Sequence, residues 1–160
     1  MARLSEINGV AVDFSPALNV RHPTTEFTFV PPIGEARYAQ MFNVRSAIGA
    51  GLSVGFGTDY PSMLWPDVNG FLQMQGWVTR IDPLNPSNEP LNPDQAITLE
   101  EAVWGFTMGG AMALGFDWPE KVGSIEAGKY ADFIVLDRNI FESPPSGRAP
   151  MVCSTPAPRK

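Results

Sequence analysis

Asp59 is the residue best placed for chemistry in this sequence. It follows the largely apolar run Leu52-Ser53-Val54-Gly55-Phe56-Gly57, which predicts a strand that ends just before the carboxylate. A carboxylate at the mouth of a parallel strand can bind a divalent metal and accept a proton from water that the metal activates. It can then pass that proton to a leaving group. An aspartate before the turn Tyr60-Pro61 can equally be a turn former, and the residue types alone leave both interpretations open.

Other metal-ligand candidates are scarce. The sequence holds one histidine, His22, and one cysteine, Cys153, and neither stands at a spacing that suggests a shared site with Asp59. A catalytic zinc site takes about three protein ligands plus an open position. His22 lies in a Pro-flanked stretch and is predicted to be a surface residue. We therefore expect that the chain alone binds no metal.

Three further residues are candidates for contact with a small molecule. Arg45 could hold a carboxylate through two parallel hydrogen bonds, and a salt bridge on a helix surface is the alternative. Tyr60 and Trp65 could line a pocket or pack in the core. Gly128-Lys129 has no Gly-rich run before it and no Ser or Thr after it, so it is predicted to be a turn rather than a phosphate loop.

Composition narrows the class of protein. The 160 residues are 44% hydrophobic and 18% charged, which is typical of a globular chain. The formal net charge of -6 is spread without a Lys/Arg block, which disfavours nucleic-acid and anionic-membrane partners. A single cysteine, no apolar leader and no long apolar run favour a cytoplasmic location.

The elements that must position these residues alternate between strand and helix. Strands are predicted over 10–14 and 52–57 and helices over 35–50, 67–79 and 98–115, with short strands at 123–125 and 133–136. Residues 17–34 and 81–93 are predicted to be loops, and the Pro-rich tail after 141 to be disordered. This α/β rhythm indicates a parallel sheet with about two of the eight units of a (β/α)₈ barrel.

Four segments in order resemble one family. In chain order they are Arg45-Ser46-Ala47-Ile48, Phe56-Gly57-Thr58-Asp59-Tyr60-Pro61, Ile97-Thr98-Leu99-Glu100-Glu101-Ala102, and the stretch 122–137 with Gly123-Ser124-Ile125 and Gly128-Lys129-Tyr130-Ala131-Asp132. Together they are similar to the amidohydrolase superfamily, specifically the amidohydrolase-3 branch that includes N-substituted formamide deformylases. The resemblance implies a metal-dependent hydrolase acting on carbon–nitrogen bonds other than peptide bonds. It also implies that Asp59 is a metal ligand and proton shuttle.

The resemblance assigns the chain to the end of such an enzyme. It implies the last βα units of an amidohydrolase barrel over 1–118, part of the accompanying β-sandwich over 119–141, and a tail over 142–160. The His-x-His pair and further histidines of the family are not in the sequence, and Ser15 and Leu18 stand where the family often has Gln and His. We therefore expect the chain alone to be inactive, as a truncated or pseudogene product or one piece of a split enzyme.

The expected partners follow from this assignment. In the complete enzyme the resemblance implies a divalent metal, which we expect to be zinc. We also expect a small amide-type substrate in contact with Tyr60 and Arg45. Two βα units would leave both edges of the sheet open, so the chain itself is expected to bind a complementary N-terminal fragment or to self-associate. The alternative is a non-enzymatic binding module, or a relic, that associates through an exposed sheet edge.

Overall fold

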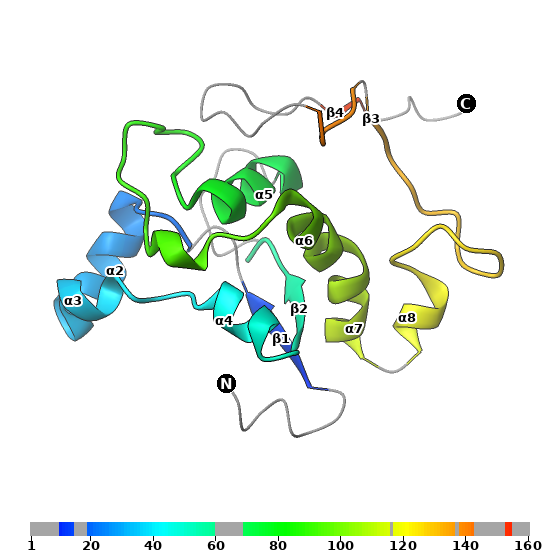
Figure 1. Ribbon diagram of the computed structural model, residues 1–160, viewed down its shortest axis with the longest axis horizontal. Helices are drawn as coiled ribbons and strands as arrows, with labels where there is room; N and C mark the ends of the chain where they lie inside the picture. Colours follow the sequence, from blue (N-terminus) through cyan, green and yellow to red (C-terminus); the bar gives the residue numbers. More distant parts are fainter. Residues whose placement is uncertain are drawn as a thin grey trace.

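Two parallel strands lie at the centre of the molecule. The structure is a computed structural model that describes residues 10–14, 19–59, 69–115, 117–136, 138–142 and 153–154. Strands β1 (Ala11–Phe14) and β2 (Ser53–Phe56) pair in parallel, with Asp13 opposite Gly55 and Phe14 opposite Phe56 (Figure 1). The carboxyl ends of both strands therefore lie at the same end of the sheet, as the predicted α/β order requires.

One face of this sheet carries the hydrophobic core. Val12, Phe14, Val54 and Phe56 share that face by strand alternation and pack in one cluster. The helices that contribute to the cluster are α4 (Val44–Gly49), α5 (Gly70–Thr79) and α6 (Leu99–Trp104). Their burial removes apolar surface from water, which is the main stabilising contribution to such a small domain.

Trp77 joins the ends of both strands to α5. Its fully buried ring stacks on Phe56 with centroids 4.8 Å apart and meets Phe14 edge-on at 5.7 Å. Aromatic pairs at such distances and angles add to the stabilisation that comes from burial alone. The carboxyl ends of β1 and β2 are thus fixed relative to α5.

Arg80 holds the irregular excursion that follows α5. Its Nε donates a hydrogen bond to the Leu91 carbonyl at 2.8 Å, and the Leu91 N–H donates to the Arg80 carbonyl at 2.9 Å. Burial lowers the pKa of the Arg80 guanidinium to about 10. The excursion is irregular as predicted, apart from the short 3₁₀ helix η2 (Pro93–Gln95).

The helix predicted over 98–115 forms with a change of pitch inside it. Thr98 and Glu101 make the predicted capping box, and α6 continues into the π-helical segment η3 (Gly105–Gly109) and α7 (Gly110–Leu114). A β-carbon added to Gly109 would lie 2.0 Å from the Val54 carbonyl oxygen. Only a glycine at this position lets the helix approach β2 so closely.

This approach covers the outer edge of β2. The Gly57 N–H donates to the Phe14 carbonyl at 3.2 Å, so the backbone groups of Val54 point away from β1 and towards Gly109. One of the sheet edges that was expected to be open is therefore covered by η3 and α7, which is a correction to the prediction.

The loop predicted over 17–34 is wrong in its second half, where α2 (Pro23–Ile33) forms. His22 caps it, because its Nδ1 accepts the Thr24 N–H at 3.2 Å and its own N–H donates to the Thr25 hydroxyl at 3.2 Å. His22 is thus a helix cap rather than only a surface residue. Pro23 occupies the first helical position, where a backbone N–H would have no partner within the helix. It is therefore compatible with α2, although prolines in this stretch favoured the prediction of a loop.

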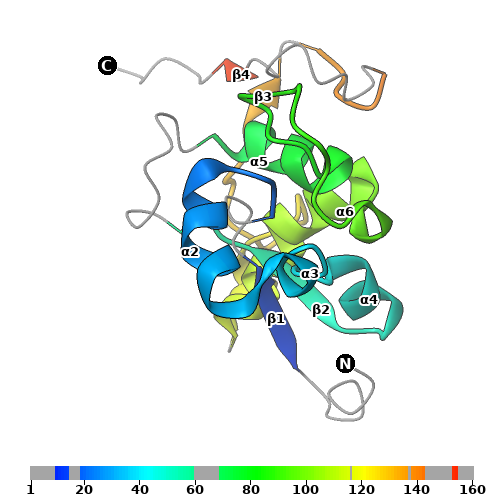
Figure 2. The ribbon, with the colours of Figure 1, turned by 90° about the vertical axis from the view of Figure 1, so that its left-hand side faces the viewer.

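The remaining elements depart from prediction in length. The helix expected over 35–50 is divided into α3 (Glu35–Tyr38) and α4, because Phe42 between them has a φ of 62°. Figure 2 views the molecule from the side of α2 and α3, with β1 and β2 beside each other below. No helix in the described ranges is long and apolar enough to cross a membrane.

The C-terminal part contains less sheet than predicted. Residues 123–125 are not a strand, because Gly123 has a φ of 94° and the chain turns there, after the short helix α8 (Trp118–Lys121). The strand predicted over 133–136 shortens to β3 (Val135–Leu136), which pairs antiparallel with β4 (Cys153–Ser154). Apart from Glu142 and β4, the tail that was predicted to be disordered lies outside the described residues.

Candidate functional site

Asp59 lies just beyond the carboxyl end of β2, where the sequence placed it. Its backbone has a φ of 56°, a left-handed conformation that most residues with a side chain avoid and that Asp tolerates better than most. Backbone strain of this kind gathers at functional sites, where a side chain is needed despite its conformational cost. The conformation therefore favours a functional role for this carboxylate, although a turn alone can also place Asp there.

Asp13 is the site residue that the sequence interpretation missed. Its pKa is raised, first because of burial and second because of the negative charge of Asp59, so the two carboxylates are close enough to interact. The Asp13 carboxylate also lies over Gly57, where an added β-carbon would be 3.5 Å from Oδ2. An acidic residue inside an otherwise apolar strand was the signal in the sequence.

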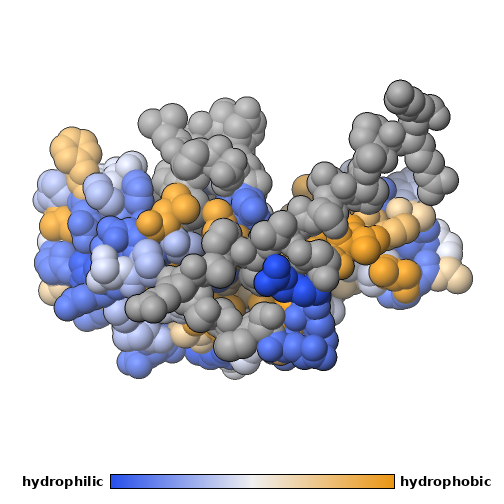
Figure 3. Space-filling model, turned by 90° about the horizontal axis from the view of Figure 1, so that it is seen from above, coloured by the Kyte–Doolittle hydropathy of each residue, from blue (hydrophilic) through white to orange (hydrophobic). Residues whose placement is uncertain are grey.

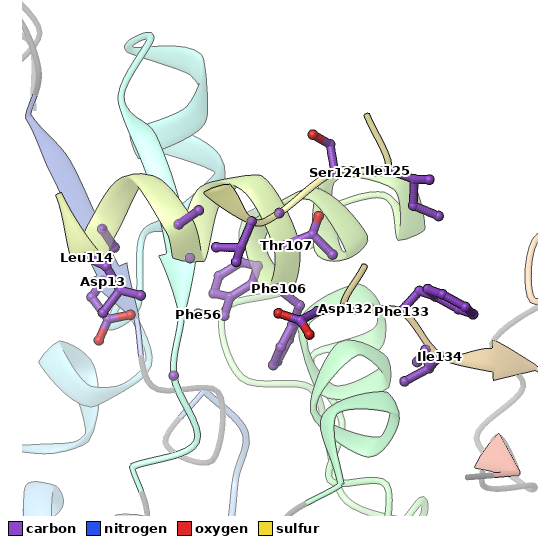
Figure 4. A pocket seen from close by; sticks show the side chains of 16 residues that line it. Asp13, Phe56, Phe106, Thr107, Leu114, Ser124, Ile125, Asp132, Phe133 and Ile134 are labelled. Carbon is purple, nitrogen blue, oxygen red and sulfur yellow. The ribbon is translucent and has the colours of Figure 1, made fainter. Parts of the chain in front are cut away.

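A cleft of about 1080 Å³ lies against this part of the sheet. Asp13, Phe56 and Gly57 form its wall on the strands, and the helix side contributes Phe106 and Leu114 (Figure 4). The segments 122–125 and 132–134 complete the lining. The cleft therefore begins two residues before Asp59 and is mostly apolar.

The rim of the cleft carries a small polar cluster. Lys129 donates a hydrogen bond to the Ser124 hydroxyl at 2.6 Å and pairs with Glu126 at 3.4 Å. Hydrogen bonds from Ser124 and Lys129 lower the pKa of Glu126. Gly128 has a φ of 96°, which confirms the predicted turn at Gly128-Lys129.

Arg45 forms a salt bridge, which was the alternative to a substrate-binding role in the sequence analysis. Its Nη1 and Nη2 each lie 2.6 Å from a Glu101 carboxylate oxygen, and its Nε and Nη2 also donate to the Ala96 carbonyl at 3.2 and 3.1 Å. The Arg45 hydrogen bonds are the main reason that the pKa of Glu101 is lowered. The pair joins α4 to the start of α6. A contact between Arg45 and substrate stays a prediction.

A complete metal site does not form within the described ranges. They contain no group of three His, Cys, Asp or Glu side chains that could hold a metal ion. Asp13 and Asp59 offer two carboxylates, fewer than a catalytic zinc takes from protein. Tyr60, Trp65, Ser15 and Leu18 lie outside the described residues, so their predicted roles stay predictions.

Comparisons with known proteins agree with these features. Residues 2–154 match the model of a family described as the amidohydrolase family, Amidohydro_3. The chain is 35% identical over 102 residues to an N-substituted formamide deformylase of Arthrobacter pascens, a match over 64% of this chain and 17% of that protein. The chain thus corresponds to less than a fifth of the relative's length, and no solved structure shows a significant match. Because the family model covers nearly the whole sequence, the chain belongs to the amidohydrolase family.

Proposed function

We propose that this chain forms the C-terminal part of a metal-dependent amidohydrolase that hydrolyses a non-peptide carbon–nitrogen bond. The observation that carries the proposal is the position of Asp59. This residue has a strained backbone and follows the carboxyl end of a parallel strand, in a member of this family. Barrel hydrolases place catalytic groups at that end of their strands. The residue ranges 1–118, 119–141 and 142–160 remain the proposed division into barrel, sandwich and tail.

Asp59 would carry the proton chemistry of this reaction. Its carboxylate would accept a proton from the attacking water and deliver it to the nitrogen that leaves. A divalent metal, for which we propose zinc, lowers the pKa of a bound water molecule when present. The described residues supply too few ligands for it, so the remaining ligands would come from parts of the enzyme beyond these residues.

The proposed role of Asp59 can be tested in an assembled enzyme. The chain alone, with zinc and N-formyl or N-acyl amines, should show no turnover. Put in place of the matching segment of the Arthrobacter pascens deformylase, it should support turnover. Asp59→Asn should reduce this turnover by at least about 100-fold, because it removes the proton acceptor.

The matched control is Asp94→Asn, an exposed carboxylate in η2, which should leave turnover unchanged. Turnover that survives in Asp59→Asn would refute the assigned role. Zinc-dependent turnover by the chain alone would refute the proposed dependence on further ligands.

A non-enzymatic binding module is the second candidate function. It is favoured by the outer edge of β1, which pairs with no strand among the described residues, and by the exposed hydrophobic side chains near the cleft. Seen from the side of β3 and β4, hydrophobic surface gathers toward the end of the molecule that carries α8 (Figure 3). A stable monomer that melts cooperatively would favour this candidate over the enzyme part, because such a chain would have closed its own core.

A further inference from the structure

The large cleft combines apolar walls with two carboxylates. Asp13 and Asp132 both line it, and neither has an ion-pair partner among the described residues. Figure 4 shows the two carboxylates on either side of Phe56, with Phe106 beside Asp132. Among the described residues, the other polar side chains of the lining are the hydroxyls of Thr107 and Ser124. A ligand that fills the cleft meets aromatic and aliphatic surface and negative charge.

No basic side chain of the described residues lines the cleft. Lys129 reaches its rim, and there its charge is offset by Glu126 at 3.4 Å. The charged side chains in the described lining of the cleft are therefore both acidic, which favours cations over anions there. Carboxylates with no counter-ion beside a mostly apolar cavity match a ligand that has an apolar body and one positive charge.

We propose that this cleft binds the apolar N-substituent of an amide substrate and retains it as the protonated amine after hydrolysis. The inference rests on the proposed function, since amide hydrolysis is what generates an amine. Water adds its oxygen to the carbonyl carbon, the carbon–nitrogen bond breaks, and one proton of the water goes to the nitrogen, which gives an amine and a carboxylic acid. The acid then loses its proton and the amine takes one up from solvent. At neutral pH the products are an ammonium ion and a carboxylate.

The position of the cleft suits the nitrogen side of the substrate rather than the acyl side. It begins at Asp13 and Gly57, next to Asp59, which is the proposed proton donor to the nitrogen. The related protein from Arthrobacter pascens is named for N-substituted formamides, whose acyl group is a single carbon. The bulk of such a substrate is its N-substituent, and the cleft volume of about 1080 Å³ is at the upper end of small-molecule sites.

Binding of an amine can be measured without any turnover. The probes are naphthylmethylammonium, the neutral naphthylmethanol and the anionic naphthoate, titrated into the full chain by calorimetry at pH 7 and low salt. We expect the ammonium to bind about three- to tenfold more tightly than the neutral alcohol, because the carboxylates are partly exposed and screened by solvent. Naphthoate should bind most weakly.

Three variants and one control separate charge from apolar contact. Asp13→Asn and Asp132→Asn should each reduce the preference for the ammonium and leave binding of the alcohol unchanged, whereas Asp94→Asn should change neither. Phe133→Ser, in the apolar wall, should weaken all three probes. Equal binding of ammonium and alcohol, no binding of either, or a preference that survives in both Asp variants would overturn the proposal. If the assembled enzyme shows no turnover but the chain still prefers the ammonium, the result would contradict the proposed function and leave the proposed amine site standing.

Discussion

At the scale of single residues, the two carboxylates differ in how far the sequence could reveal them. Asp59 was found because it belongs to a local motif directly after a predicted strand. Asp13 was missed because its proximity to Asp59 depends on the pairing of β1 with β2, which are far apart in the chain. Local patterns carry no register between distant strands, so only the fold could bring this pair together.

The backbone of Asp59 leads to a prediction about stability. Asp59→Gly should be more stable than Asp59→Ala by about 1 kcal/mol, because glycine adopts a positive φ without a steric cost. Urea denaturation of both variants measures the difference. Asp13, within a regular strand, is the control, and there the alanine variant should be the more stable one. Alanine equal to glycine at position 59 would show that the left-handed conformation is not held in solution.

The raised pKa of Asp13 predicts a pH dependence. The folded chain holds this proton more tightly than the unfolded chain, so Asp13 stabilises the fold below its ordinary pKa of 3.8. That contribution is lost as the pH rises through the higher folded-state pKa. Asp13→Asn should therefore gain stability relative to the parent chain between pH 3 and pH 7, by up to about 0.5 kcal/mol, because the carboxylate is only partly buried and solvent screens it. Denaturation across that pH range measures it, and a relative loss of stability would contradict the sign.

At the scale of elements, the two central strands and the helix that begins at Thr98 were predictable, whereas α2 and the π-helical segment η3 were not. The strands 10–14 and 52–57 and the capping box at Thr98 are encoded in neighbouring residues. Helix α2 was missed because Pro31 and Pro32 argued for a loop, yet they lie in its last turn. The π-helical pitch of η3 was also invisible, since it accompanies contact with β2 rather than any local preference.

The packing of η3 on β2 gives the sharpest test of the fold. Gly109→Ala should destabilise the chain by about 2–3 kcal/mol, because its β-carbon would clash with backbone that cannot move away. Gly110→Ala is the matched control, since its β-carbon would be 3.6 Å from the nearest atom. The control should stabilise the helix by up to about 1 kcal/mol. Thermal or urea unfolding of both variants decides, and equal effects would place the helix elsewhere.

At the scale of the whole molecule, the sheet edge that pairs with no strand among the described residues is on β1. Two open edges were expected from the number of strands, but the glycines of η3 and α7 allow a helix to cover β2. This outcome could not be predicted from the sequence, because it depends on how η3 and α7 pack against β2 in the folded chain. Unpaired backbone groups along β1 remain a template for adding a strand.

We therefore predict self-association that depends on the β1 edge. Ala11→Lys should reduce light scattering at micromolar concentration, since a lysine on an edge strand opposes pairing with another chain. Ala36→Lys, on the exposed surface of α3, should leave scattering as in the parent chain. A parent chain that is monomeric throughout this concentration range would remove the β1 edge as an association site.

The burial of Trp77 also gives the molecule an optical reporter of its candidate site. Trp104 and Trp118 are 48% and 42% exposed, whereas Trp77 is 0% exposed and its indole Nε1 has no hydrogen-bond partner among the described residues. Burial shields this indole from water and iodide, so its emission lies at short wavelength, and the charge beside it, that of the Arg80 guanidinium 5.3 Å from the ring centroid, is fixed in place. In a Trp65→Phe background, the iodide-resistant blue emission therefore belongs to Trp77. Because Trp77 stacks on Phe56 at the carboxyl end of β2, a red shift of that emission would signal the opening of the strand ends.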